Sequence, residues 1–188
     1  MRRKVFDVLV SAGGLIVVAV LLVAGALLMW GYSFTSSSVH NQLAQQDIFF
    51  AAKGSADLAN PLRGKYLDQY AGQQLLTGPQ AEAYANDQIL VDMNTMPYHG
   101  VYAKIAEASL AHPNNAELAS LVQVSFRGTT LRGLLLTAYA FWTFGQIALW
   151  AGIAAFILAG LMALLVAFGF WHSRRVPDSA EILAHAAA

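Results

Sequence analysis

Two long apolar runs lie toward opposite ends of the chain and enclose a region of ordinary polarity. The first run, residues 8–30, has 23 positions without a charged side chain. The second has 41 consecutive positions without one, from Gly133 to Ser173. Because a helix of about 20 residues crosses a bilayer core of about 30 Å, the first run predicts one transmembrane helix. The second run is longer than one helix needs.

Tryptophans indicate where the spans end, because tryptophan and tyrosine gather at the two membrane interfaces. Trp150 and Trp171 are 21 positions apart, which is about 32 Å along a helix and matches the bilayer core. We therefore predict the second span over residues 149–171, with Trp30 as the corresponding anchor of the first span. The alternative is a hairpin of two helices within 133–171, but its first leg of about 12 residues is short for a span.

The apolar surplus before the second span predicts a separate interfacial helix over residues 128–148. Its apolar side chains recur at helical spacing. They are Leu131, Leu134, Leu135, Ala138, Trp142, Gly145 and Leu149. We expect this face to pack under the domain between the spans or to lie at the lipid headgroups.

Residues 31–127 predict a helical domain, because turn signals divide them into short amphipathic pieces and strand-like alternation is nearly absent. Thr77 followed by Gln80 is a capping box that opens a helix to about Met96, with one apolar face. Further helices are expected from Tyr102 to His112 and from Ala116 onward. Two earlier sets of apolar residues also have near-helical spacing. They are Val39, Leu43 and Phe50, and then Leu62, Tyr66, Tyr70 and Leu75.

Basic residues flank both spans on the sides that face the chain ends. Arg2, Arg3 and Lys4 precede the first span, whereas Arg174 and Arg175 follow the second. The positive-inside rule then places residues 1–7 and 172–188 in the cytoplasm and residues 31–148 mostly outside it. The fold class expected is an all-α protein of the plasma membrane, with two antiparallel transmembrane helices and a helical extracytoplasmic domain between them.

A cleaved signal peptide is the alternative interpretation of the first run. Its basic start and the small residues Ala24-Gly25-Ala26 fit that pattern. The apolar run continues to Trp30, however, past the point of cleavage. We therefore expect a retained anchor.

Small residues recur along both predicted spans, and small residues allow close approach of helices in lipid. One row has a period of four and the other a period of seven. The rows are Ala151, Ala155, Ala159, Ala163 and Ala167, and then Ala12, Ala19 and Ala26. We expect these faces to pack helix against helix.

The chemistry available to the chain is limited. It has no cysteine, and its five histidines form no local pair at metal-ligand spacing. Neither span carries an ionisable side chain, which argues against an ion path or haem ligation. No nucleophile or phosphate-loop motif occurs, and the formal net charge is zero, which does not favour nucleic acid. We expect no enzyme, no cofactor and no metal.

Two arginines lie on the expected outer side of the second span, against the usual charge bias. Arg127 and Arg132 are five positions apart and do not share a helix face. Each is a candidate contact to a lipid phosphate or to an acid of the outer domain. Arg132 is the better candidate for a phosphate because it is nearer the span.

Several blocks of the sequence together resemble a family of small actinobacterial two-span membrane proteins. The blocks are MRRKVFDVLVSAGG (1–14), WGYSF (30–34), VHNQLAQQDIFF (39–50), YAGQQLLTGPQAEAYAN (70–86) and FRGTTLRGLLLTAYAF (126–141). The resemblance implies location and architecture and carries no catalytic residues. The chain departs from the family pattern at Asp87 and Gln88, where members often place a histidine, which weakens a metal role there.

Two functions from different classes fit these observations. The first is a non-enzymatic accessory or assembly subunit of a larger membrane complex, respiratory or cell-envelope, with other membrane subunits as partners. The alternative is a lipid- or quinone-binding or sensing module that uses the outer domain. For that alternative, a groove lined by tyrosines is the candidate site, with Tyr66, Tyr70, Tyr84 and Tyr102.

Overall fold

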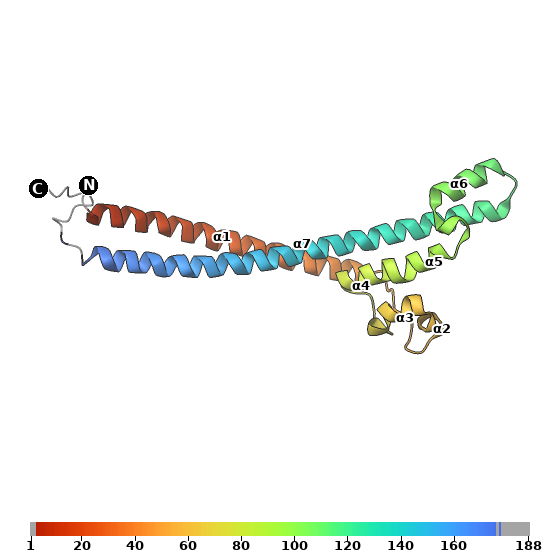
Figure 1. The fold of residues 1–188 in the computed structure, drawn as a ribbon, viewed down its shortest axis with the longest axis horizontal. Helices are drawn as coiled ribbons and strands as arrows, with labels where there is room; N and C mark the ends of the chain where they lie inside the picture. The colour runs from red at the N-terminus through yellow and green to blue at the C-terminus, as the bar shows by residue number, and fades with distance from the viewer. Residues whose placement is uncertain (1–2, 176, 178–188) are drawn as a thin grey trace, which may run out of the picture. The chain divides into compact units, whose positions relative to one another are not determined.

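The computed structural model describes residues 3–175 and 177, and these form helices and loops without a β-strand. The chain divides into two compact units. Residues 1–33 and 146–188 form one, called here the two-helix unit, and residues 34–145 form the multi-helix unit. The first helix, α1 (Arg3–Ala44), and the last, α7 (Ala116–Ser173), each contribute to both units (Figure 1).

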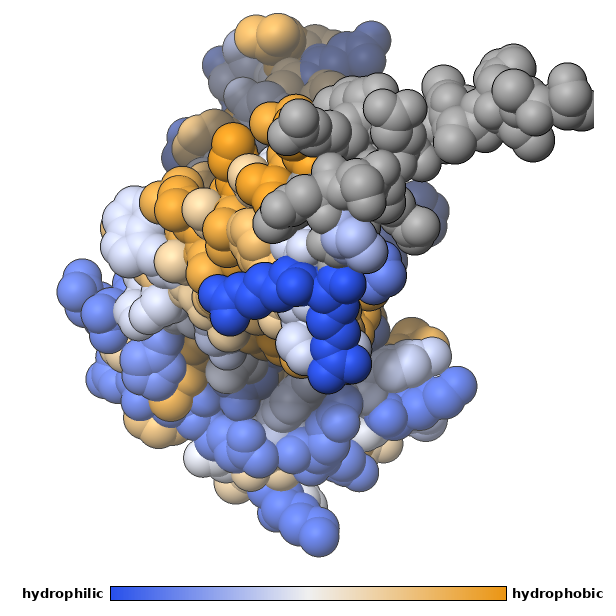
Figure 2. Space-filling model, turned by 90° about the vertical axis from the view of Figure 1, so that its left-hand side faces the viewer, coloured by the Kyte–Doolittle hydropathy of each residue, from blue (hydrophilic) through white to orange (hydrophobic). Residues whose placement is uncertain are grey.

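Both long helices are long and apolar enough to cross a membrane. Only 17% of the most apolar 18-residue window of each is buried inside the chain, whereas the core helix of a soluble protein is mostly buried. Hydrophobic side chains accordingly gather on the exposed surface of the two-helix unit (Figure 2). Ile16 and Leu165 are examples, at 68% and 65% exposed. By length and composition, each of these helices could therefore cross a membrane.

Within the two-helix unit, α1 and α7 pack along a seam whose positions alternate by three and four residues. The contacts join Ser11 with Gly169, Gly14 with Val166, and Gly25 with Phe156. Figure 1 shows these red and blue parts of the two helices side by side. A Cβ at Gly25 would lie 3.0 Å from the Phe156 ring, so glycine permits this close approach. The seam positions are Ser11, Gly14, Val18, Leu21, Gly25 and Leu28 on α1, and Gly152, Ala155, Ala159, Met162, Val166, Gly169 and Ser173 on α7.

The predicted alanine rows coincide with this seam only in part. Ala155 and Ala159 are buried in it, but Ala151, Ala163 and Ala167 are exposed. A period of four drifts around a helix of 3.6 residues per turn, whereas a seam between two helices needs an average near 3.5. On α1 the period of seven is right but the phase differs by one residue: Ala12, Ala19 and Ala26 are exposed beside Ser11, Val18 and Gly25.

The three tryptophans predicted as interface anchors are all exposed in the two-helix unit. Trp30, Trp150 and Trp171 have exposed fractions of 67%, 68% and 54%. The guanidinium of Arg175 lies over the Trp171 ring at 4.0 Å from its centre. The predicted basic flank and aromatic anchor of the second span are therefore in contact with each other. Of the N-terminal bases, Arg2 lies outside the described residues, as do residues 176 and 178–188 of the predicted tail.

Short helices fill the multi-helix unit between the two long ones. In chain order they are α2 (Ala56–Ala59), α3 (Pro61–Leu67), the 3-10 turn η1 (Asp68–Tyr70), α4 (Gly78–Ala83), the π-helix η2 (Tyr84–Ile89), α5 (Leu90–Asn94), the 3-10 segment η3 (Pro97–Gly100) and α6 (Tyr102–Ala111). The interfacial segment predicted at 128–148 is part of α7, which runs on without a break into the predicted span.

The capping box predicted at the start of α4 is confirmed. Thr77 Oγ1 accepts from the Gln80 backbone N–H at 3.4 Å, and Gln80 Oε1 accepts from the Thr77 backbone N–H at 3.0 Å. The helix predicted to reach about Met96 continues through η2 and α5 to Asn94. Its expected apolar face is buried, with Ala81 and Ala85 fully inaccessible.

A single apolar core holds this unit together, formed by α1, the short helices and α7. Its fully or mostly buried members are Val39, Leu43, Phe50, Leu58, Leu67, Leu75, Ala81, Ala85, Ile89 and Leu135. Placing Phe50 and Leu75 on helices was wrong, because both lie in loops. Their backbones pair there instead: Phe50 N–H donates to Gln73 O at 2.9 Å and Leu75 N–H to Ile48 O at 2.8 Å. Apolar residues in such a paired loop are buried to the same degree as apolar residues on a helix face.

Candidate functional site: an apolar groove between α1 and α7

An apolar groove of about 430 Å³ lies in the multi-helix unit, between the last turns of α1 and the middle of α7. This volume falls within the range of small-molecule pockets. Its fourteen lining residues are Phe34, Thr35, Ser38, Val39, Gln42, Leu43, Gln46, Ile48, Leu131, Leu134, Leu135, Thr137, Ala138 and Phe141. None of them is ionisable.

The floor and the rim of the groove differ in burial. Val39, Leu43 and Leu135 form the floor, at 6%, 5% and 3% exposed. Phe34 and Phe141 are more than half exposed at one end, only four positions beyond Trp30 and nine before Trp150 along the sequence. That end of the groove is therefore the one nearest the predicted spans in the chain.

Helical periodicity explains why these side chains converge. On α1, Val39 and Leu43 are four residues apart and so lie one above the other. On α7, Leu131, Leu134, Leu135 and Ala138 belong to the stripe predicted from the sequence, and the structure places these four along the groove. Trp142 of the same stripe packs against Gly78, which opens α4. The predicted apolar face therefore serves partly as a groove wall and partly as a packing face.

Five polar residues line the groove among the apolar ones. Gln42 Nε2 donates to Ser38 Oγ at 2.9 Å, and the hydroxyl of Thr137 donates to Gly133 O at 2.9 Å. In the part of the chain that the structure describes, the Oε1 of Gln42 accepts no hydrogen bond, and the Gln46 amide group makes none. The two exposed glutamines therefore offer hydrogen-bonding groups at the end of the groove away from Phe34.

The tyrosines predicted to share a groove do not line this one. Tyr70 and Tyr84 pack on Phe50, with ring centres 5.2 Å and 5.5 Å from it. Tyr102 packs on Phe126 at 5.8 Å. The Tyr66 ring lies 5.1 Å from the ammonium of Lys65. The rings thus occupy separate packing positions, and aliphatic side chains with two phenylalanines line the groove instead.

The candidate phosphate contacts are placed differently from each other. Arg127 is exposed. Arg132 is partly buried and donates from Nη2 to Asn86 Oδ1 of the π-helix η2 at 2.9 Å. Its Nε is buried without a hydrogen-bond partner. Although Arg132 follows the groove residue Leu131 in the chain, its guanidinium is engaged by the π-helix.

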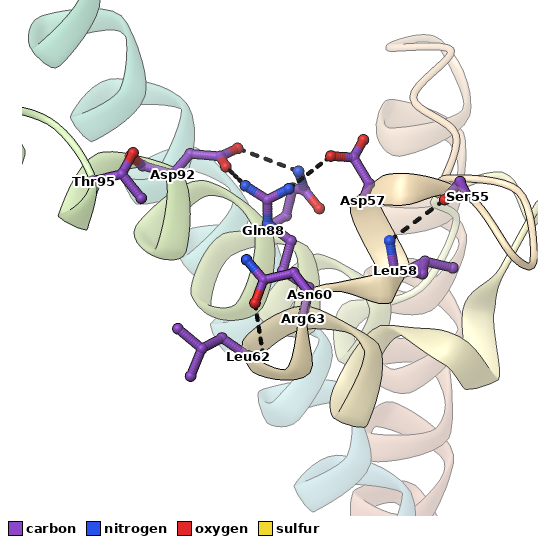
Figure 3. Close-up of polar contacts among 9 residues, drawn as sticks. All are labelled: Ser55, Asp57, Leu58, Asn60, Leu62, Arg63, Gln88, Asp92 and Thr95. Atoms are coloured by element: carbon purple, nitrogen blue, oxygen red, sulfur yellow. Dashed lines mark hydrogen bonds and ion pairs between the residues drawn. The ribbon is translucent and has the colours of Figure 1, made fainter.

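A second polar cluster gathers around Arg63 of α3 (Figure 3). Its guanidinium pairs with Asp57 Oδ1 at 2.7 Å and with Asp92 of α5. Gln88 of η2 donates to the other oxygen of Asp92 at 3.2 Å. The Arg63 side chain is 13% exposed, and the two acids are about half exposed. This cluster joins α2, α3, η2 and α5, and sequence spacing gives no signal of it, because its members come from four elements.

Two ionisable groups of this unit have shifted pKa values. Burial, followed by the charge of Asp57, raises the pKa of the Tyr84 hydroxyl. Burial, followed by the charge of Glu82, raises the pKa of the Asp87 carboxyl. Neither residue lines the groove. Within residues 3–175 and 177, no three histidine, aspartate or glutamate side chains gather in a way that could hold a metal ion.

Known proteins provide no further guide to the site. No family model matches the chain, nor does any curated protein or solved structure.

Proposed function

We propose that the chain is a plasma-membrane protein with two antiparallel spans, and that residues 31–148 lie mostly outside the cytoplasm. The order of contacts supports the antiparallel part: Ser11 meets Gly169, Gly14 meets Val166 and Gly25 meets Phe156, so the numbers rise on α1 as they fall on α7. Arg174 and Arg175 at the end of α7, with Trp171 beside them, support a cytoplasmic C-terminus by the positive-inside rule.

Reporter fusions test this topology. A phosphatase that is active only outside the cytoplasm is expected to be inactive when fused after Ala188. It is expected to be active when inserted between Asn114 and Asn115, in the exposed loop before α7. Activity after Ala188 would overturn the topology.

The function that the geometry supports best is binding of the apolar chain of a membrane lipid, without catalysis. The observation that carries it is the groove itself: apolar side chains line most of it, and its Phe34–Phe141 end follows directly on the predicted spans in the sequence. The hydrocarbon chain of a lipid that leaves the bilayer at this point exchanges contact with other lipids for contact with the apolar wall of the groove. Burial of each CH₂ group contributes about 0.8 kcal/mol relative to water. Because the groove keeps the hydrocarbon chain out of water as the bilayer does, moving several carbons from the bilayer into the groove costs little free energy.

Filling the groove tests this function. Ala138 lines the groove, whereas Ala140 is exposed on another side of α7. The Ala138→Trp variant should lose co-purified lipid in native mass spectrometry of the full chain, and Ala140→Trp should keep it. Because Ala138 also touches the core, a second variant, Leu134→Gln, makes an exposed part of the wall polar without adding bulk. Retention of lipid by both groove variants would contradict the proposal.

An accessory role in a larger membrane complex is the second candidate, and the open small-residue rows favour it. Ala163 and Ala167 of α7, and Ala12 and Ala19 of α1, are exposed in the two-helix unit. Exposed rows of this kind suit close packing by a helix of another subunit. Crosslinking in native membranes tests this role: Ala163→Leu should weaken a crosslinked complex while the chain itself stays folded. Ala159→Leu, in the internal seam, should destabilise the chain.

A further inference from the structure

The groove lining is uncharged throughout, and this limits the ligand. None of the fourteen lining residues carries a charge. A phosphate held against this wall would lose part of its hydration without gaining a cation, and such transfer is unfavourable. We infer that the groove selects a lipid whose polar head is uncharged and forms hydrogen bonds. This inference rests on the proposed lipid-chain function and specifies its ligand.

The nearest arginine in the sequence does not alter this conclusion. Arg132 follows Leu131 of the wall, but its guanidinium donates to Asn86 of the π-helix η2. It is absent from the residues that line the groove. The better of the two candidate cations for a phosphate is therefore committed to a contact inside the protein, and the other, Arg127, does not line the groove.

The two ends of the groove assign an orientation to the ligand. Gln42 lies 8 positions beyond Phe34 on α1, or about 12 Å along the helix, and Gln46 lies in the turn that follows the end of α1 at Ala44. In the proposed topology, Phe34 is the end toward the bilayer. The ligand then has the orientation of an outer-leaflet lipid, with its chain toward Phe34 and Phe141 and its head at the glutamines.

The glutamines suit a neutral head. A primary amide offers both N–H donors and a carbonyl acceptor. Gln42 uses one donor on Ser38 Oγ and keeps its carbonyl oxygen available, and the amide of Gln46 forms no bond within the described chain. Carbonyl and hydroxyl groups match this set. Isoprenoid quinones and diacylglycerols are membrane lipids that carry such a head on a long apolar chain.

Ligand competition on the full chain in detergent micelles tests the inference. The probes are menaquinone-4, dioleoylglycerol, dioleoylphosphatidylglycerol and the headless hydrocarbon squalene, and binding is measured by native mass spectrometry and thermal shift. We expect at least one of the two neutral lipids to bind about tenfold or more tightly than the phosphatidylglycerol. The neutral lipid that binds more tightly identifies the ligand as a quinone or a diacylglycerol.

Variants of the glutamines separate recognition of the head from that of the chain. Gln42→Leu and Gln46→Leu should each lower the affinity for the preferred neutral lipid by about fivefold, which corresponds to the loss of one hydrogen bond. Both variants should leave the affinity for squalene unchanged. Gln45→Leu is the matched control, because Gln45 is exposed and does not line the groove.

Two outcomes distinguish the two levels of the proposal. If squalene and the neutral lipids all fail to bind, the lipid-chain function itself is overturned. If squalene and the neutral lipids bind but phosphatidylglycerol binds as tightly as the neutral lipids, only the inference of an uncharged head fails. The same inference alone fails if the glutamine variants leave every lipid affinity unchanged.

Discussion

Arg132 Nη2 donates a hydrogen bond to Asn86 Oδ1 across 46 residues of sequence. The bond ties the first third of α7 to the π-helix η2, which contains Asn86. A π-turn inserts one residue into an α-helix and re-aims the side chains on it. The contact is therefore a fold-specific tie between α7 and the short helices.

A double-mutant cycle should detect this tie. Arg132→Met and Asn86→Leu each remove one partner, and we expect a coupling of about 1 kcal/mol in the free energy of unfolding. Denaturant titration of the purified protein measures it. Arg127→Met is the control, because Arg127 is exposed, and it should change stability by less than about 0.5 kcal/mol. Additive single effects would show that the bond contributes nothing specific.

Replacement of Arg63 should loosen α2 and α3 from α5. Arg63→Met leaves Asp57 and Asp92 without their shared cation. The acids are about half exposed, so solvent screening reduces the loss, and we expect about 2 kcal/mol. Added salt should narrow the gap between wild type and variant. Lys53→Met, at an exposed loop position, is the control in the same titration.

Alanine substitutions at two adjacent glycines of α1 should have different effects on the stability of the protein. A Cβ at Gly14 would lie 2.5 Å from Val166 Cγ2, whereas nothing lies within 4 Å of one at Gly13. Gly14→Ala should therefore destabilise the chain by about 1–3 kcal/mol through overpacking. Gly13→Ala should be neutral or stabilising, since alanine favours helix. Unfolding in mixed detergent micelles compares the two, and equal effects would contradict the seam.

Asp87 should make the protein less stable as pH rises. Burial and the charge of Glu82 raise its pKa in the folded chain, so the folded state binds the proton more tightly than the unfolded state. The penalty is absent below the ordinary aspartate pKa of about 4 and appears as pH rises from there through the raised folded pKa.

The Asp87→Asn variant tests this sign. It should melt at a higher temperature than wild type at pH 7 and lose that advantage at pH 4 or below. Glu107→Gln, at an exposed position of α6, is the control for removal of a carboxylate elsewhere in the chain. An Asp87→Asn effect of the same size at both pH values would refute the titration argument.

Local signals in the sequence predicted the elements whose cause is local. Charge-free length predicted the two long apolar helices, and Thr77 with Gln80 predicted the start of α4. The stripe from Leu131 to Ala138 predicted a shared apolar face, although not that it borders a groove. These features depend on residues within one or two turns of each other, so the sequence alone determined them.

Only the tertiary structure decided which face meets which. The seam uses Ser11, Val18 and Gly25 in place of their alanine neighbours, because the phase of a helix is set by its partner and not by its own composition. Arg132 turns to Asn86, and the tyrosines separate onto Phe50 and Phe126, because those partners lie far away in sequence. The groove arises for the same reason. Helices α1 and α7 each supply one apolar wall, and the sequence of one wall does not indicate which residues form the other.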